Sequence, residues 1–366
     1  KNFNEQIEKK KYIIISDGIF STELSEKAFK NGIDIAITGE SDFVFLELIK
    51  KITNNQEWKT TQQIIYNENG KMIKTDSSKN FIDINQLPLP NRNFFKNKIN
   101  KNMIDIIVSR GCNFHCTICQ PISRKLYGQP MRYRSHESVL NELKQLINEQ
   151  WIGSKTIVDF HSDTLSANRE WLIQLCSLLM KEKIKIKWRA TVRFDCVDEE
   201  LISIMKKAGC SQVDPGIEAI SEEARNKIIN KQITNEQIKN GIKLFKKYNI
   251  EFYTDFIIGI PDSFLKELIL KIIFIIRYRP KSLTLSTLIP VPGTALFKIA
   301  EKKGLLKPSA YDPLNYDQKL LVKNISFYKN VSPQRIKFER YLIYIFLTLI
   351  HPNIYIIKII KKIFRG

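Results

Sequence analysis

Apolar residues recur with two alternating periods along most of the chain. After residue 102, short apolar runs typical of strands alternate with longer stretches in which apolar residues repeat at helical spacing. The pattern predicts strands over 103–109, 155–160, 184–194, 211–217, 251–260 and 282–290, and helices over 135–150, 168–183, 198–208, 221–247 and 263–276. These repeats predict an α/β fold in which helices cover a parallel sheet that is closed or nearly closed into a barrel. Active residues are then expected at the carboxyl ends of the strands.

The first part of the chain shows the same alternation over fewer units. Strands over 12–16 and 34–38 and helices over 22–30 and 42–52 are typical of a doubly wound, Rossmann-like sheet. About two strand–helix units are present, whereas such a domain usually has about four or five. Because the chain also lacks an initiator Met, we expect the front half of this domain to be missing and the N-terminus not to be natural.

The remaining segments divide the chain further. Hairpin strands are predicted around Gly70, and Pro88 and Pro90 favour the extended backbone of a linker. We therefore predict a partial Rossmann-like domain, a linker, a partial (βα)6-type barrel and a C-terminal helical extension over 1–80, 81–102, 103–300 and 301–366, respectively.

The last residues combine apolar and basic positions. The apolar run over 341–350 is too short for a membrane span, which needs about 20 residues, and Pro352 interrupts it. Residues 354–364 mix Ile pairs with Lys pairs at helical spacing. This segment is predicted either to dock on the barrel or to lie on a membrane surface as a basic amphipathic helix.

The amino-acid composition indicates which binding partners and which cellular compartment to expect. Lys and Arg total 58 against 38 acidic residues, a net charge of +20, which favours an anionic partner but also arises from compositional bias, so nucleic acid is not expected. Residues 1–11 do not resemble a signal peptide, and six cysteines with three in one short segment do not suggest a disulfide framework. We expect a cytoplasmic protein, with membrane association as an alternative.

The segment VSRGCNFHCTICQP carries the clearest chemical signal. Cys112, Cys116 and Cys119 have C-x3-C-x2-C spacing directly after a predicted strand, and Gly111 permits a tight turn. Thiolates suit iron–sulfur clusters, and a cubane with three protein ligands keeps one iron open for a substrate or cofactor. The alternatives are a zinc site that uses His115, for which the chain has no second ligand pair, or buried structural cysteines.

The three other cysteines are isolated within predicted elements. Cys176, Cys196 and Cys210 are therefore predicted to be small buried residues without a ligand role.

The cysteine spacing, its place after the first barrel strand and the repeats that follow resemble the radical S-adenosylmethionine superfamily. The resemblance implies a [4Fe-4S] cluster on Cys112, Cys116 and Cys119, whose open iron binds S-adenosylmethionine. It also implies reductive cleavage to methionine and a 5'-deoxyadenosyl radical, with an electron donor such as ferredoxin or flavodoxin. The barrel would exclude water from this reaction.

Further stretches resemble the subgroup with an N-terminal cobalamin-binding domain, which includes radical methyltransferases and the anaerobic magnesium-protoporphyrin ester cyclase. These are GIDIAITGESDFVFLELIK, INQLPLPNRNFF, YRSHESVLNEL, DPGIEAIS, FIIGIPDS and LIPVPGTALF. The likeness implies methylation, cyclisation or rearrangement of a small or lipid-like metabolite. The subgroup's D-x-H-x-x-G loop has no counterpart before residue 100, so this chain alone is expected to bind cobalamin poorly unless upstream sequence is supplied. A degenerate domain kept for packing is the alternative.

Matching positions imply further cofactor contacts, although no catalytic residue can be named. Asp163 would lie near the methionine end of S-adenosylmethionine, Arg193 and Glu218 near its carboxylate or ribose, and Ile257 to Gly259 near adenine. Ile118 stands where the family usually has an aromatic residue against adenine, which preserves apolar contact but loses stacking. For the charged residues, ordinary ion pairs are the alternative reading.

Two other functions remain open at this level. A truncated, non-catalytic remnant that binds a partner or nothing is the first. The second is tRNA methylthiolation, but that group carries an additional N-terminal cluster, and no cysteine precedes Cys112 here.

Overall fold

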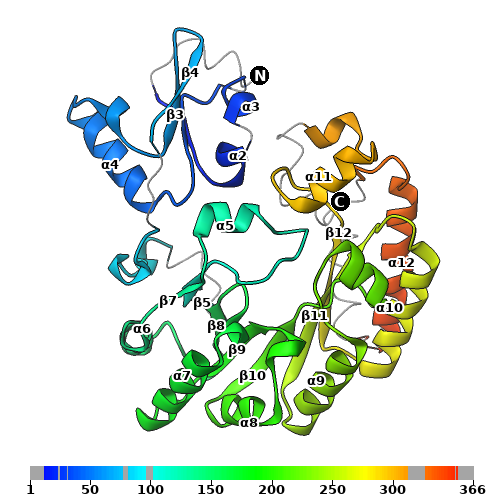
Figure 1. The fold of residues 1–366 in the computed structure, drawn as a ribbon. Coiled ribbons are helices and arrows are strands. Elements are labelled where there is room, and N and C mark those ends of the chain that lie inside the picture. Colours follow the sequence, from blue (N-terminus) through cyan, green and yellow to red (C-terminus); the bar gives the residue numbers. More distant parts are fainter. Residues whose placement is uncertain are drawn as a thin grey trace.

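The computed structural model describes residues 12–23, 25–30, 32–76, 81–95, 102–311, 326–350 and 352. A small N-terminal unit lies above a larger unit in which helices surround a curved sheet (Figure 1). The helix α5 (Ile122–Tyr127) lies between the two units and contacts the N-terminal helix α2 (Gly18–Glu23).

The larger unit is built on a six-stranded sheet with the order β12-β11-β10-β9-β8-β5, and all adjacent strands are parallel. The two edge strands, β12 and β5, are not paired with each other, so the sheet is an open, curled half-barrel. This confirms the predicted α/β fold with a partial barrel. The strands are β5 (Met103–Ile107), β8 (Ile157–His161), β9 (Lys187–Val192), β10 (Cys210–Pro215), β11 (Glu251–Ile258) and β12 (Ser282–Thr287).

Helices cover the convex face of this sheet (Figure 1). They are α6 (His136–Asn148), α7 (Arg169–Lys181), α8 (Glu199–Lys207), α9 (Asn235–Lys247) and α10 (Phe264–Tyr278). All are close to their predicted ranges except α9, which covers only the later part of 221–247, because a separate short helix over Glu223–Ile228 occupies the earlier part. Four of them begin where a side-chain oxygen accepts a hydrogen bond from the first turn, a contact that replaces a missing helical partner. The capping residues are Ser135, Asn168, Asp198 and Thr234.

The two faces of the sheet differ in chemistry. Alternate side chains such as Val158, Trp188 and Val213 are buried in the apolar core between the sheet and its helices. On the other face Arg189 lies 3.0 Å from Asp159 and 3.8 Å from Asp214. Because strand side chains alternate between faces, the same strands that supply apolar side chains to the core place charged side chains on the concave face.

The N-terminal unit has a mixed four-stranded sheet. Strand β1 (Ile15–Ser16) pairs in parallel with β2 (Ile35–Ile37), which pairs antiparallel with β3 (Ile64–Glu68), and β3 forms the predicted hairpin with β4 (Lys71–Lys74) around Gly70. Helices α2, α3 (Ser25–Lys30) and α4 (Asp42–Thr53) complete the unit. The helix predicted over 22–30 corresponds to the end of α2 and to α3, and α2 begins earlier, at Gly18; residue 24 between them lies outside the described residues.

The C-terminal part adds α11 (Ala295–Lys302) and α12 (Pro333–Ile350). Helix α12 packs beside α10 and against β11. Its Arg340 donates hydrogen bonds to the Leu285 carbonyl and the Thr287 hydroxyl of β12, at 2.7 and 3.0 Å. The amphipathic segment predicted over 354–364 lies outside the described residues. Across the described parts of the chain, none of the helices has the length and apolarity to cross a membrane.

Candidate active site

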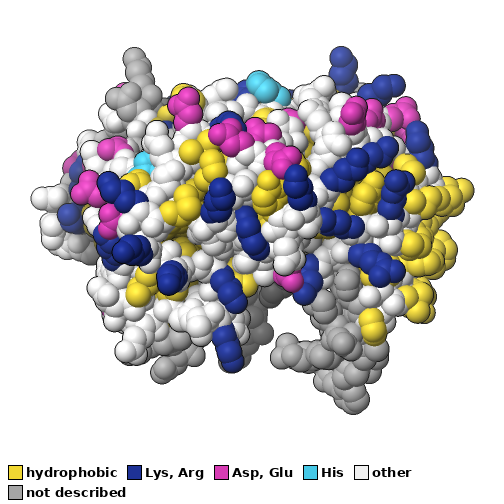
Figure 2. All heavy atoms as spheres, turned by 90° about the horizontal axis from the view of Figure 1, so that it is seen from below, with side chains coloured by type: hydrophobic (Ala, Val, Ile, Leu, Met, Phe, Trp, Pro, Cys, Tyr) yellow, Lys and Arg dark blue, Asp and Glu magenta, His cyan; other side chains and the backbone are white. Residues whose placement is uncertain are grey.

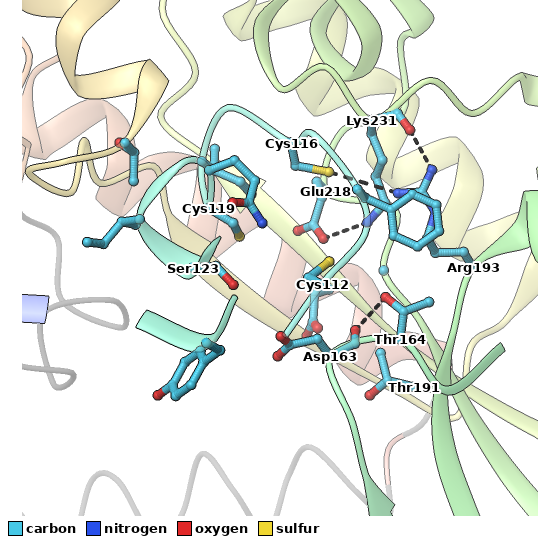
Figure 3. A pocket seen from close by; sticks show the side chains of 18 of the residues that line it. Cys112, Cys116, Cys119, Ser123, Asp163, Thr164, Thr191, Arg193, Glu218 and Lys231 are labelled. Carbon is cyan, nitrogen blue, oxygen red and sulfur yellow. Dashed lines mark hydrogen bonds and ion pairs between the residues drawn. The ribbon is translucent and has the colours of Figure 1, made fainter. Parts of the chain in front are cut away.

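A cavity of about 410 Å³ opens at the carboxyl ends of the strands. Its wall combines the cysteine loop with strand ends and the start of α11. Figure 3 shows Cys112, Cys116 and Cys119 from the loop grouped with Glu218 around a common space, with Asp163 and Arg193 nearby. The structure therefore brings together six of the nine residues named from the sequence, and Ile118 makes a seventh at the wall.

The cysteine loop follows β6 (Ser109–Arg110), and its turn requires a glycine. Gly111 has φ +90°, and a Cβ there would lie 3.3 Å from the Gly128 carbonyl oxygen. Within the loop, the backbone N–H of Cys119 donates to the Cys116 carbonyl at 3.1 Å. This turn projects the thiols from one short segment.

Two distant segments fix the far side of the loop. Thr117 donates from its N–H to the Ile229 carbonyl at 2.8 Å and from its hydroxyl to the Ile228 carbonyl at 2.6 Å. The N–H groups of Ala295 and Leu296 donate to loop carbonyls at 2.7 and 3.0 Å. The loop is thus held by the segment after β10 and by the start of α11, elements far from it in sequence.

Burial changes the pKa of two thiols in the loop. Burial raises the pKa of Cys112, and it raises the pKa of Cys119 to about 12, with the neighbouring Cys116 and Glu218 acting in the same direction. Cys119 is nevertheless accessible from the cavity. Its side chain borders the cavity on one side and is surrounded by protein on the others. Thiol protons must leave when a metal binds.

The arrangement of the possible ligands does not suit a single metal ion. Among the residues that the structure describes, no three His, Cys, Asp or Glu side chains are grouped closely enough to hold one ion. This gives the zinc alternative at His115 no support. Ligands of a cubane surround four irons and four sulfides, so their thiols stand farther apart than those around one ion. Three thiols facing one cavity fit that requirement.

Arg193 is positioned by several groups. Its guanidinium forms a bidentate pair with Asp195 at 3.0 and 2.9 Å, donates to the Lys231 carbonyl at 2.6 Å and lies 3.7 Å from the ring centroid of Phe114. Its remaining Nη1 points at Cys116, 3.9 Å from the sulfur. The alternative reading of Arg193 as part of an ion pair is therefore realised, and the contact with S-adenosylmethionine stays a prediction.

Glu218 reaches the cavity from an unusual backbone position. It has φ +64°, and its N–H and C=O bond to Asp255 and Ile257 of β11 at 3.0 and 2.8 Å. Its carboxylate accepts a hydrogen bond from Lys231 Nζ at 2.9 Å. The backbone strain is maintained by pairing with the neighbouring strand, which is characteristic of functional positions.

Asp163 follows β8 and borders the cavity between the two units. Burial raises its pKa, an effect that the nearby His161 partly offsets. The other two named positions lie away from the cavity wall: Ile257 is buried, and the N–H of Gly259 donates to Glu339 of α12 at 3.0 Å. Their predicted contact with adenine is not tested by this arrangement.

The remaining cysteines differ in burial. Cys176 and Cys210 are buried as predicted. Cys196 is only half-buried, and its sulfur lies 3.8 Å from Asp195, so the prediction of burial was wrong there. The short turn after β9 leaves this side chain at the edge of the core.

Several wall residues were missed from the sequence. Lys231, Thr191, Asp214 and Asp255 line the cavity. Burial raises the pKa of Asp214 to about 7, with Asp255 and Glu218 contributing. Thr191, Asp214 and Asp255 alternate with core residues near strand ends, a signal that could have identified them. Lys231 lies in a segment without such a pattern.

An ion-pair network joins the N-terminal unit to the cysteine loop. Glu40 is buried, with 5% of its surface exposed, and its carboxylate forms ion pairs with Arg110 at 3.2 Å and with Arg132 at 2.8 Å. Arg110 also forms a bidentate pair with Asp42 at 2.7 and 3.0 Å, and this bonding holds the pKa of that carboxyl below its usual range. Because Arg110 is two residues before Cys112, the network fixes the start of the loop.

Comparison with known proteins assigns this architecture. Residues 106–270 match the Radical SAM superfamily, and the chain carries a radical SAM domain. It is 28% identical over 314 residues to an uncharacterized methyltransferase of Pyrococcus horikoshii, covering 84% of this chain and 66% of the relative. It is 23% identical over 295 residues to the anaerobic magnesium-protoporphyrin IX monomethyl ester cyclase of Cereibacter sphaeroides, covering 77% of this chain and 47% of that enzyme.

A solved structure shares the fold. The radical S-adenosylmethionine methyltransferase TsrM of Kitasatospora setae, with cobalamin and a [4Fe-4S] cluster bound, superposes with a TM-score of 0.63 at 15% identity. The match covers 82% of this chain and 60% of TsrM. The chain thus spans between about half and two thirds of these relatives' lengths.

Proposed function

We propose that this chain cleaves S-adenosylmethionine reductively at a [4Fe-4S] cluster held by Cys112, Cys116 and Cys119. The observation that carries the proposal is the convergence of these thiols, Asp163 and Glu218 on one cavity at the strand ends of a radical SAM domain. When bound, the cluster supplies one electron that breaks the sulfur–C5' bond, giving methionine and a 5'-deoxyadenosyl radical.

The surrounding residues bind and orient the cofactor. Glu218 can accept hydrogen bonds from an ammonium group or from ribose hydroxyls, with Lys231 holding its carboxylate in place. Asp163 offers a second acceptor at the wall, and Ile118 an apolar surface for adenine. The Arg193 guanidinium keeps positive charge beside Cys116, where thiolate charge gathers, with its Nη1 directed at the sulfur.

A proposal for the reaction class is supported by the relatives, which include an uncharacterized methyltransferase and a cyclase. We propose that the radical serves methylation, cyclisation or rearrangement of a small or lipid-like metabolite, with a ferredoxin- or flavodoxin-type protein as electron donor. All four histidines follow residue 114, so the N-terminal unit described here supplies no imidazole to cobalt.

Anaerobic reconstitution with iron and sulfide tests this proposal. The wild type should bind about four irons and four sulfides per chain, and the reduced cluster should change its electron paramagnetic resonance spectrum when S-adenosylmethionine is added. Cys116→Ala should lose the signal, whereas Cys196→Ser, a cysteine outside the cavity wall, should keep it. A full cluster whose spectrum ignores S-adenosylmethionine would support the non-catalytic alternative.

A further inference from the structure

Two neighbouring helices expose an apolar surface that the proposed reaction does not use. On α10 the exposed side chains Leu265, Ile269, Ile273 and Ile276 repeat at intervals of three or four residues, so they form one stripe. Their exposed fractions lie between 49% and 64%. An isolated exposed Leu or Ile is ordinary, but a stripe of four along one helix is not.

Helix α12 carries a second stripe of the same kind. Phe338, Tyr341, Ile345 and Leu349 follow the same spacing, with Leu349 71% exposed. The two helices pack together, and the rings of Phe264 and Phe338 meet edge to face with centroids 6.3 Å apart. Figure 2 shows hydrophobic side chains gathered at the side of the molecule that α10 and α12 occupy in Figure 1. We call these eight residues the α10–α12 face.

The exposed charged residues of α10 and α12 are basic, and one of them, Lys266, pairs with the exposed Glu223 at 3.2 Å. The acidic residues of the two helices, Glu267 and Glu339, are buried and pair inward with Lys271 and Arg335 at 3.2 and 3.1 Å. The exposed helical positions beside the stripes include Arg277 and Lys337. An occupant should therefore combine an apolar body with negative charge.

The chain continues from α12 with the same chemistry. Residues 353–366 contain eight large apolar residues, four Lys or Arg and no Asp or Glu. Folding this segment onto the face would bring its cations toward Arg277 and Lys337, and pairing of two copies through the face would bring like charges together. Neither the residues after α12 nor a second copy of the chain therefore supplies the negative charge that this face should attract.

We propose that the α10–α12 face lies on an anionic lipid bilayer, with Arg277 and Lys337 against the headgroups and the apolar stripes in the interfacial layer. Amphipathic surfaces with cations beside an apolar stripe bind such membranes in this way, through buried apolar area and attraction to anionic lipid. This proposal is independent of the radical chemistry, because none of the face residues lines the cavity.

Flotation of the reconstituted full chain with vesicles tests the proposal. The wild type should float with phosphatidylcholine vesicles that contain phosphatidylglycerol, and much less with phosphatidylcholine alone. Ile269→Gln combined with Tyr341→Gln should reduce binding at least about tenfold, since each loses exposed apolar area. Ile147→Gln on α6, also an exposed apolar side chain, is the matched control and should bind as wild type.

Further variants separate the rival occupants. Arg277→Gln with Lys337→Gln should weaken binding only to the anionic vesicles, and removal of residues 353–366 should weaken binding without abolishing it. Unchanged iron content and unfolding temperature would show that the variants fold. Flotation that survives the Ile269→Gln/Tyr341→Gln change would overturn the proposal, as would absence of flotation together with a dimer that this double change dissociates.

Discussion

Among single residues, Glu218 is the most informative wall position. Its carboxylate faces the cavity, and its backbone is held at positive φ by β11. Glu218→Gln keeps the shape but removes the charge, so S-adenosylmethionine affinity should fall about tenfold, which corresponds to about 1.4 kcal/mol for a charge-assisted hydrogen bond. Equilibrium dialysis against the reconstituted protein measures this. Glu223→Gln, an exposed charge on the following turn, should leave affinity unchanged.

Asp214 should make the free energy of unfolding depend on pH. It faces Asp255 on β11, Arg189 on β9, Glu218 and Asp159, and burial raises its pKa from 3.8 to about 7. Between these values the folded state holds a proton that the unfolded state has lost, so the free energy of unfolding should fall as pH rises, by at most about 1.4 kcal/mol per pH unit.

Denaturant unfolding at a series of pH values compares the wild type with Asp214→Asn. The variant should show a flatter decline from about pH 4 to about pH 7, because its side chain does not titrate. Parallel curves for the two proteins would mean that Asp214 is not protonated in the folded state.

Individual residues also mark the limits of sequence reasoning. The cysteines could be predicted because their spacing is local and the chemistry of thiolates is distinctive. The partner of Glu218, Lys231, could not be assigned, since no sequence period connects residues that meet only after folding. Cys196 looked buried because it lies beside a strand, but a turn places it at the edge.

Among the elements, the junction of β6 with the N-terminal unit suggests a role for that incomplete sheet. Glu40 holds both Arg110 and Arg132, which flank the cysteine loop. Glu40→Gln leaves two partly buried guanidinium groups without this carboxylate, so it should lower the free energy of unfolding by roughly 3 kcal/mol. Chemical denaturation measures the change.

The control lies in the same unit. Glu47→Gln removes an exposed i,i+4 pair with Lys51 and should cost less than about 0.5 kcal/mol. Iron content should also fall in Glu40→Gln, because the start of the loop loses its anchor. Equal stability and equal cluster content in both variants would show that the N-terminal unit does not position the loop.

The strands and helices of the larger unit could be predicted because the apolar period of each element is local. Four of the helices begin within a residue of their expected starts, as where Ser135 or Asn168 caps them, but α9 begins at Asn235, well after the start of the range predicted over 221–247. The opening of the sheet was harder to anticipate, since it depends on whether β12 and β5 pair. The antiparallel pairing of β3 with β2 could not be predicted either, because the apolar pattern of a strand does not specify which strand it pairs with or in which direction.

For the whole molecule, the half-barrel, the cysteine loop and the cavity form one site, while the α10–α12 face lies on other elements. The substrate could not be predicted from the sequence, because the wall of charged and apolar residues is consistent with many metabolites. The relatives narrow the class of reaction without fixing the product.

The most direct test of the central claim is an anaerobic assay of 5'-deoxyadenosine. Reconstituted wild type with dithionite and S-adenosylmethionine should form 5'-deoxyadenosine and methionine in equal amounts, Cys116→Ala should form none, and Cys196→Ser should match the wild type. Formation by Cys116→Ala at the wild-type rate, or no formation by a wild type that holds its full cluster, would contradict reductive cleavage at this site.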